Sequence, residues 1–252
     1  MPERRLNGLL ICGGKYHDMD FARLELLKLL AEHEHLRVRV QEDYRDTETL
    51  RRADFLVTYT CEVLPDEEQT SALAEYLAHG RRWLALHGTN SVLRYVKGKG
   101  WEAPRTAARF MQLVGSQFVA HPPIAPYRVQ LSAPEDPLLR GLSAFEADDE
   151  LYLMELQPDI EVLMHADFAG EAPGFVEREW NDARPRPVLY RKAHGSGEVL
   201  YCTLGHARGR HDMQPLMDEY PQVERGSWKQ PAFYEILRRG IRWGIRAPLE
   251  AA

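Results

Sequence analysis

The chain has 252 residues, of which 44% are hydrophobic and 28% are charged, and its formal net charge is −6. These values are ordinary for a globular protein, and we expect a single α/β domain over residues 1–252. The negative charge argues against a general nucleic-acid or anionic-membrane surface. No apolar run reaches membrane-spanning length and no signal-peptide segment opens the sequence, so we expect a cytoplasmic protein.

Strand and helix patterns alternate over the first third of the chain. We predict strands at Leu6–Cys12, Arg37–Gln41, Asp54–Thr60 and Arg82–Leu86. We predict a helix capped by Asp20 that ends near His33–His35, and a short helix over Thr47–Ala53. A third helix is predicted from Pro65 to Gly80, where acidic residues follow the proline. This order predicts a parallel sheet with helices on both faces.

An abrupt turn follows the fourth predicted strand. Gly88 permits a sharp bend directly after Leu86, and Ser91–Tyr95 is expected to begin a helix. This arrangement is typical of the nucleophile elbow of hydrolases. Here the elbow carries His87, where an elbow enzyme has serine or cysteine.

The second half of the chain is dominated by strands. They are expected at Tyr127–Leu131, Leu151–Met154, Glu161–Met164, Val188–Lys192 and Glu198–Thr203, with a hairpin tip at Gly195-Ser196-Gly197. Helices are expected at Pro104–Leu113 and Gln230–Ile245. The three cysteines, Cys12, Cys61 and Cys202, lie in or beside apolar strands and are interpreted as reduced core thiols.

Three polar clusters follow predicted strands. The first begins at Gly13 and includes His17 and Asp18. The second begins at His87 and includes Asn90, and the third contains His206 and Arg208. Because ligands of open α/β sheets bind outside the carboxyl ends of parallel strands, we expect these histidines to converge on one cleft. A surface or capping role is the plainer interpretation of each histidine taken alone.

Two further segments are candidates for the same cleft. His121 precedes a pair of prolines, which hold its backbone extended. Glu150 ends a run of three acidic residues directly before a predicted strand; a solvated turn is the simpler interpretation of that run. Trp101, Trp180 and Trp228 lie in polar, loop-like segments, where one of them is a candidate for stacking on a sugar ring and core packing is the alternative.

Five motifs occur in order along the chain: GGKYHD, ALHG, GSQFVAHP, DELY and LGH. Together they resemble the ThuA-like family named for trehalose utilisation, from Leu9 to about Trp243. The resemblance implies a class I glutamine amidotransferase-like fold, which is a flavodoxin-like three-layer α/β sandwich with antiparallel additions in its second half. The residues that match the family motifs are His17, Asp18, His87, Gly88, His121, Glu150 and His206.

The same resemblance bears on activity. Amidotransferases of this fold carry cysteine at the elbow and complete a triad with a later histidine and glutamate. Here His87 occupies the elbow, and Ala207 and Arg208 follow His206, so amidotransferase activity is not expected. The family is connected with sugar breakdown, including routes through oxidised (keto) disaccharides. The segment after His206 is more basic than the family pattern.

Two mechanisms fit these residues. Neutral imidazoles with a carboxylate can hold a divalent metal such as zinc, for which the candidate ligands are His17, His87, His121 and His206. The same groups can instead act as acid and base without a metal. We assign catalytic roles to His17, His87, Glu150 and His206, and substrate-binding roles to Asp18, Gly88, Asn90, His121 and Arg208.

The sequence thus predicts an enzyme of carbohydrate metabolism that acts on a keto-sugar or glycoside, as an isomerase or a lyase/hydrolase. The expected mechanism is histidine acid/base chemistry, in which a metal ion is optional. The alternative is a non-catalytic module that binds a sugar or another small molecule on an enzyme-derived scaffold. In either case the expected partner is a small sugar-like molecule, and assembly into a homo-oligomer is left open.

Overall fold

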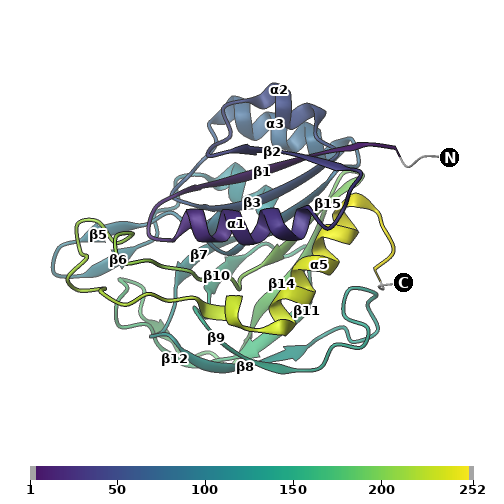
Figure 1. Ribbon diagram of the computed structural model, residues 1–252. Helices are drawn as coiled ribbons and strands as arrows, with labels where there is room; N and C mark the ends of the chain where they lie inside the picture. The colour runs from purple at the N-terminus through teal and green to yellow at the C-terminus, as the bar shows by residue number, and fades with distance from the viewer. Residues whose placement is uncertain (1–3, 250–252) are drawn as a thin grey trace.

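The fold centres on a mixed β-sheet, seen in a computed structural model that describes residues 4–249 (Figure 1). Within these residues the sheet has nine strands. Five of them are parallel neighbours, in the spatial order β2 (Leu36–Gln41), β1 (Leu6–Gly14), β3 (Phe55–Cys61), β4 (Arg82–Leu86) and β15 (Gly197–Cys202). The chain crosses from one side of β1 to the other between β2 and β3, and this reversal is where open α/β sheets place their ligand sites.

Antiparallel strands extend the sheet beyond β15. They follow in the order β14 (Pro185–His194), β11 (Ile160–Asp167), β8 (Ala125–Leu131) and β9 (Phe145–Asp149). Three short pairs lie outside this sheet: β5 (Arg94–Val96) with β6 (Gly100–Glu102), β7 (Ser116–Ala120) with β10 (Leu153–Leu156), and β12 (Gly170–Glu171) with β13 (Glu179–Trp180). The expected antiparallel additions in the second half are confirmed.

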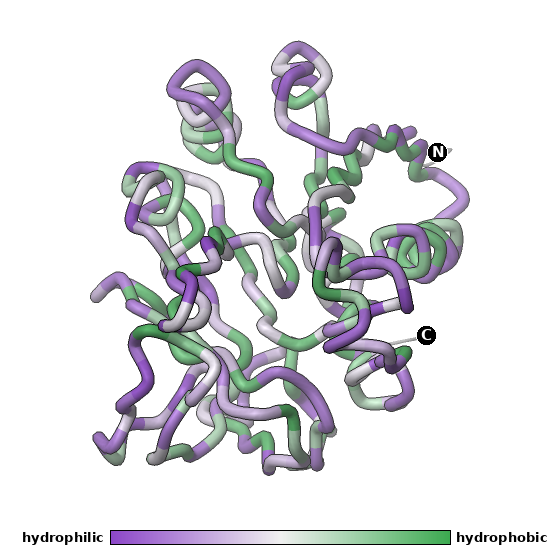
Figure 2. The backbone as a smooth tube through the Cα atoms, turned by 90° about the vertical axis from the view of Figure 1, so that its left-hand side faces the viewer, coloured by the Kyte–Doolittle hydropathy of each residue, from purple (hydrophilic) through white to green (hydrophobic). Residues whose placement is uncertain are grey.

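Helices cover both faces of the sheet and give the three layers (Figure 1). One face packs against α1 (Met19–Leu30) and α5 (Pro231–Ile245). The other packs against α2 (Thr47–Arg52), α3 (Glu67–Ala78) and α4 (Ala108–Val114). Side chains of β1 alternate between the two cores, because neighbouring residues of a strand point to opposite faces. Hydrophilic residues predominate in the outer loops (Figure 2).

The structure corrects several predicted boundaries. Asp18, rather than Asp20, caps α1 by accepting a hydrogen bond from the Phe21 amide at 3.1 Å, and the helix ends at Leu30. The helix α4 begins at Ala108, later than predicted. No α-helix begins at Ser91. The elbow is instead a single 3₁₀ turn, η1 (His87–Asn90), after which the described chain continues in extended form into β5.

The position of the acidic run Asp148–Glu150 also differs from the prediction. Asp149 is the last residue of β9, so Glu150 follows a strand and lies before β10, which begins at Leu153. Asp149 and Glu150 are buried, with 1% and 7% of their surface exposed, so the interpretation as a solvated turn is wrong for these two acids. No helix among residues 4–249 is long and apolar enough to cross a membrane.

We expect the three cysteine thiols to resist alkylation in the native protein. All three are free and buried, and burial raises the pKa of Cys12 to about 11 and that of Cys202 to about 12. Burial also raises the pKa of Cys61, well above its usual value. Because the thiolate is the reactive form, iodoacetamide at about pH 8 should modify the protein only after unfolding in urea. Mass spectrometry that finds rapid native alkylation at one of them would contradict this.

Candidate functional site

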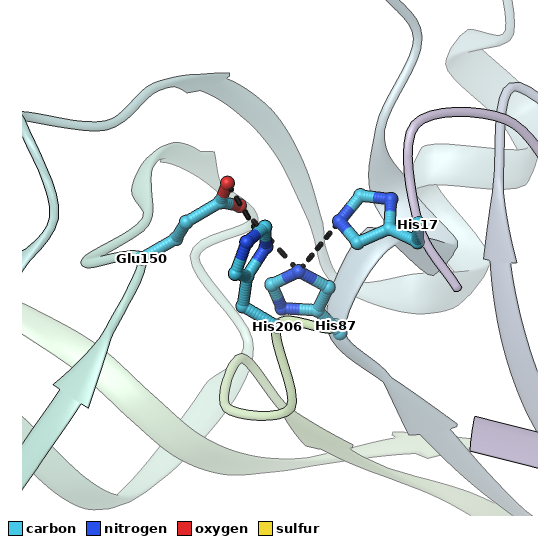
Figure 3. Close-up of side chains that lie close together, drawn as sticks. All are labelled: His17, His87, Glu150 and His206. Atoms are coloured by element: carbon cyan, nitrogen blue, oxygen red, sulfur yellow. Dashed lines mark hydrogen bonds and ion pairs between the residues drawn. The ribbon is translucent and has the colours of Figure 1, made fainter. Parts of the chain in front are cut away.

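Four side chains from distant parts of the chain meet at the carboxyl edge of the parallel strands (Figure 3). His17, His87 and His206 follow β1, β4 and β15, and Glu150 follows β9. One nitrogen or oxygen atom from each of the four lies within 4.8 Å of the others. The predicted convergence of histidines therefore occurs, and the strand ends of the sheet account for it.

Unusual backbone conformations turn the first two histidines toward each other. Gly14, at φ 123°, lies so close to β3 that a Cβ atom there would be 1.9 Å from the Cys61 carbonyl oxygen. His87 has φ 45°, in the left-handed region that few residues other than glycine adopt. The single hydrogen of the Tyr201 hydroxyl is shared between the His87 carbonyl oxygen and Asn90 Oδ1, the latter at 2.7 Å, which holds the turn in this conformation.

Backbone carbonyl groups fix the hydrogen positions on these two rings. His17 Nδ1 lies 3.1 Å from the Lys15 carbonyl oxygen, and His87 Nδ1 lies 2.7 Å from that of Thr203. A carbonyl oxygen only accepts hydrogen bonds, so both Nδ1 atoms carry a hydrogen. The two Nε2 atoms then face each other at 2.9 Å. In the neutral rings, both of these atoms carry lone pairs.

His206 carries its hydrogen on the other ring nitrogen, Nε2, because a second carboxylate accepts it. Its Nε2 atom donates to Glu224 Oε2 at 2.6 Å, which turns Nδ1 toward Glu150. Nδ1 lies 3.1 Å from Glu150 Oε1, but at an angle that makes no hydrogen bond. Among the described residues, this buried nitrogen has no hydrogen-bond partner.

The Glu150 carboxylate is the common neighbour of the histidines. Its oxygens lie 3.4 Å from His87 Nε2 and 3.5 Å from His121 Nε2, in addition to the contact with His206. His121 donates Nδ1–H to the Pro122 carbonyl at 2.7 Å. It lies at the edge of the site, outside the group of four that could share one ion, and Glu150 takes the place expected for it.

Burial and neighbouring charges separate the pKa values of the site. Burial, reinforced by repulsion from His87, holds the pKa of His17 well below its usual value. Burial also opposes the charged form of His206, but attraction to Glu150 and the hydrogen bond to Glu224 outweigh it and raise the pKa. For Glu150, burial works against ionisation, whereas His206, His121 and His87 together bring the pKa well below its usual value.

A cavity of about 430 Å³ opens over the four residues. His17, His121 and Glu150 line it, whereas His87 and His206 lie fully buried beside them. Aromatic rings form much of the remaining wall: Tyr16, Trp101, Phe118, Tyr152, Phe175 and Tyr220. This combination of apolar walls with a few converging polar groups is typical of small-molecule sites.

The other predicted substrate-binding residues are placed less uniformly. Arg208 lines the cavity, with its guanidinium paired to Glu224 at 2.6 Å. Asp18 caps α1 and pairs with Arg225 at 2.9 Å, away from the cavity wall. Gly88 packs against the end of β3, and the Asn90 amide donates to Ser116 at 2.7 Å. These two residues therefore form the turn that supports His87.

Sequence analysis assigned no role to two carboxylates that matter here. Glu224 holds His206, but no motif or strand end marks it in the sequence. Asp149 accepts hydrogen bonds from the backbone of both Glu150 and His206. Only its place in the acidic run, directly before Glu150, pointed to it. Of the three loop tryptophans, Trp101 lines the cavity, whereas Trp228 is buried and Trp180 packs on Arg186.

Replacing His17 by alanine should make the metal-free protein less sensitive to acid. The lowered pKa means that the folded state binds this proton more weakly than the unfolded chain does. Stability that depends on neutral His17 is thus complete above the unfolded-state pKa of about 6.5, and declines as the pH falls through and below it. Urea unfolding in EDTA, from about pH 7.5 to 5, should show that the free energy of unfolding falls more steeply for the wild type than for His17→Ala. Parallel pH profiles would contradict the prediction.

The strand order and the three layers define a flavodoxin-like α/β fold. Two solved proteins described as ThuA-like share this fold. The one from Parabacteroides merdae is 18% identical and has a TM-score of 0.65, with 99% of this chain and 93% of that chain covered. The one from Bacteroides uniformis is 17% identical, with a TM-score of 0.59 and coverages of 82% and 84%.

A match to a family model gives the more specific assignment. The model ThuA, described as trehalose utilisation, matches residues 9–218, and this chain belongs to that family. A search of curated proteins finds no match. A β-galactosidase from Rahnella sp. R3 has a TM-score of 0.56 at 12% identity, over 95% of this chain but 31% of that enzyme, and this likeness shows the fold alone. The family description indicates a role related to carbohydrates.

Proposed function

We propose that this chain is an enzyme of carbohydrate metabolism with a divalent metal ion held by His17, His87, Glu150 and His206. Its substrate would be a keto-sugar or a glycoside, and its reaction an isomerisation, an elimination or a hydrolysis. Amidotransferase chemistry is not proposed, because the elbow carries His87. Nor does nearby Cys61 replace the missing nucleophile, since it is buried and burial raises its pKa well above the usual value.

The observation that carries this proposal is the distance of 2.9 Å between Nε2 of His17 and Nε2 of His87, whose lone pairs face each other. A proton shared between His17 and His87 would relieve their repulsion, but it would leave His206 Nδ1 without a partner. A metal ion relieves both problems, because it accepts lone pairs from all three rings and from the Glu150 carboxylate. A single ion would therefore satisfy the three ring nitrogens and the carboxylate oxygen that face one another at the site.

The donor set favours zinc or a related transition ion. Three imidazole nitrogens and one carboxylate oxygen are ligands that such ions prefer. Metal-binding histidines usually donate their other ring N–H to a carbonyl or a carboxylate. Lys15, Thr203 and Glu224 supply these acceptors here. When bound, the ion would act as a Lewis acid toward a substrate oxygen.

His121 is the best placed group for proton transfer to and from a ligand. It lines the cavity, its side chain is 22% exposed, and its Nδ1–H is committed to Pro122. Nε2 remains on the Glu150 side of the ring, within reach of a ligand above the four residues. An imidazole nitrogen can both accept and donate a proton, which suits proton exchange beside a ketone or at a glycosidic oxygen.

Trp101 is the candidate for contact with a sugar ring. It lies on β6, where its backbone bonds to Gly174 and Val176 hold it at the cavity. Tyr16 and Tyr95 each meet it edge to face, with ring centroids 5.3 Å apart, which restrains the indole before any ligand arrives. Aromatic rings offer a large, rigid apolar surface to a ligand whose edges are polar.

We expect the purified protein to contain roughly one divalent transition-metal ion per chain, because the four donor atoms already face one another. Inductively coupled plasma mass spectrometry of protein prepared without chelators measures this. His17→Ala should lose the ion, whereas the control His79→Ala, at an exposed histidine on the end of α3, should keep it. Metal-free wild-type protein that also fails to bind added zinc would overturn the metal centre.

Trp101→Ala should weaken the binding of a sugar ligand without removing the metal ion. An aromatic contact contributes about 0.5–1.5 kcal/mol, so the Kd should rise roughly two- to twelvefold. Calorimetry with trehalose and its keto derivative is the measurement, with Trp180→Ala as the matched control. An unchanged Kd would remove Trp101 from the site. Binding of both sugars by the wild type without turnover would favour the non-catalytic alternative.

A further inference from the structure

We infer that Asp149 is a positioning residue, whose buried carboxylate holds Glu150 and His206 in place as ligands of one metal ion. This inference rests on the proposed function, because it concerns the same four-residue centre. Asp149 itself is not one of the four residues. Its role is argued from the backbone groups that its oxygens contact.

Four backbone N–H groups donate to this one carboxylate. Oδ1 accepts from Glu150 at 2.8 Å and from His206 at 3.1 Å. Oδ2 accepts from Gly205 at 3.0 Å and from Ser227 at 2.9 Å. An ionised carboxylate has about four acceptor sites, so these bonds use its capacity and leave it unable to bind an ion directly.

The pattern of these bonds couples the two metal-ligand candidates. Oδ1 accepts from the backbone amides of Glu150 and His206, which follow two different strands, β9 and β15. A shift of either backbone would stretch a bond to the same oxygen atom. The separation of the Glu150 carboxylate from His206 Nδ1, which is 3.1 Å, therefore depends on Asp149.

A third segment closes over the carboxylate. The 3₁₀ turn η2 (Gly226–Lys229) brings the Ser227 amide to Oδ2. Gly226 has φ 37°, and a Cβ atom there would lie 2.6 Å from the His206 carbonyl oxygen and 2.8 Å from Asp149 Oδ2. The turn reaches this position only because residue 226 has no side chain.

The negative charge of Asp149 would favour a cation bound nearby. Burying a carboxylate is unfavourable unless hydrogen bonds compensate, and the four N–H groups provide that compensation. The carboxylate then adds a fixed negative charge beside His206 without occupying a coordination position. Groups that orient the ligands of a metal in this way commonly change its affinity ten- to hundredfold when they are replaced.

Asp149→Asn is the direct test. Whichever way the new amide turns, its NH₂ group faces two backbone N–H donors, and the charge is removed. We expect the Kd for zinc, measured by competition with a chromophoric chelator, to rise about ten- to hundredfold. The visible absorption spectrum of the cobalt-substituted protein should also change, because the geometry of the ligands changes.

Two further variants keep the test decisive. Asp66→Asn is the matched control, since the Asp66 carboxylate caps α3 by accepting from the Gln69 amide at 2.8 Å and lies outside the site. It should lower the melting temperature but leave zinc affinity and the cobalt spectrum unchanged. Gly226→Ala perturbs the same carboxylate by a single methyl group, and should weaken zinc binding even if Asp149→Asn does not fold.

The outcomes separate the two claims. A wild-type protein that binds neither zinc nor cobalt overturns the metal centre, and this inference with it. A wild type that binds both ions, together with variants at Asp149 and Gly226 that bind as tightly and give the same cobalt spectrum, overturns the role of Asp149 alone. Equal losses of zinc affinity in Asp66→Asn and Asp149→Asn would show a general effect of stability, which also overturns it.

Discussion

The centre of this protein is organised by two imidazole rings whose hydrogen positions are imposed by the backbone. Because the Lys15 and Thr203 carbonyls can only accept hydrogen bonds, His17 and His87 each turn an unprotonated nitrogen toward the other. Such a contact is unfavourable between two neutral rings. The Glu150 carboxylate and the unpartnered nitrogen of His206 lie beside it, and the proposed metal ion would bind between these groups.

The fold maintains this arrangement through strained or closely packed backbone around the cavity. Tyr16, Glu62 and His87 all have positive φ, an unfavourable conformation that persists only where the surroundings enforce it. Each follows the end of a parallel strand, β1, β3 or β4. The sheet thus provides a rigid edge, and the loops above it adopt conformations that direct side chains inward. The buried Asp149 carboxylate joins the remaining loops to this edge.

Sequence reasoning succeeded where the signal was local or followed from a general rule of α/β folds. Apolar runs indicate β1, β3 and β4, and the rule on strand ends predicts that the histidines converge. It failed at Ser91, where the elbow suggested an α-helix. A left-handed His87 begins a single 3₁₀ turn, which the distant Tyr201 hydroxyl contacts at His87 and Asn90, and no local pattern encodes that contact. It also grouped His121 with the other three histidines, whereas Glu150 is the fourth member of the group in the structure, because distances between loops are not visible in a sequence.

The sequence by itself determined the alternation of strands and helices, the histidines after three strand ends and the absence of a nucleophile at the elbow. Those properties depend on hydrophobic periodicity, on glycine positions and on residue identity, all of which are local. Only the tertiary structure decided that two acids in an apparently solvated run are buried, that Glu224 orients His206, and that Glu150 joins three imidazoles. Each of these depends on which loops meet above the sheet, and packing between distant segments fixes that meeting.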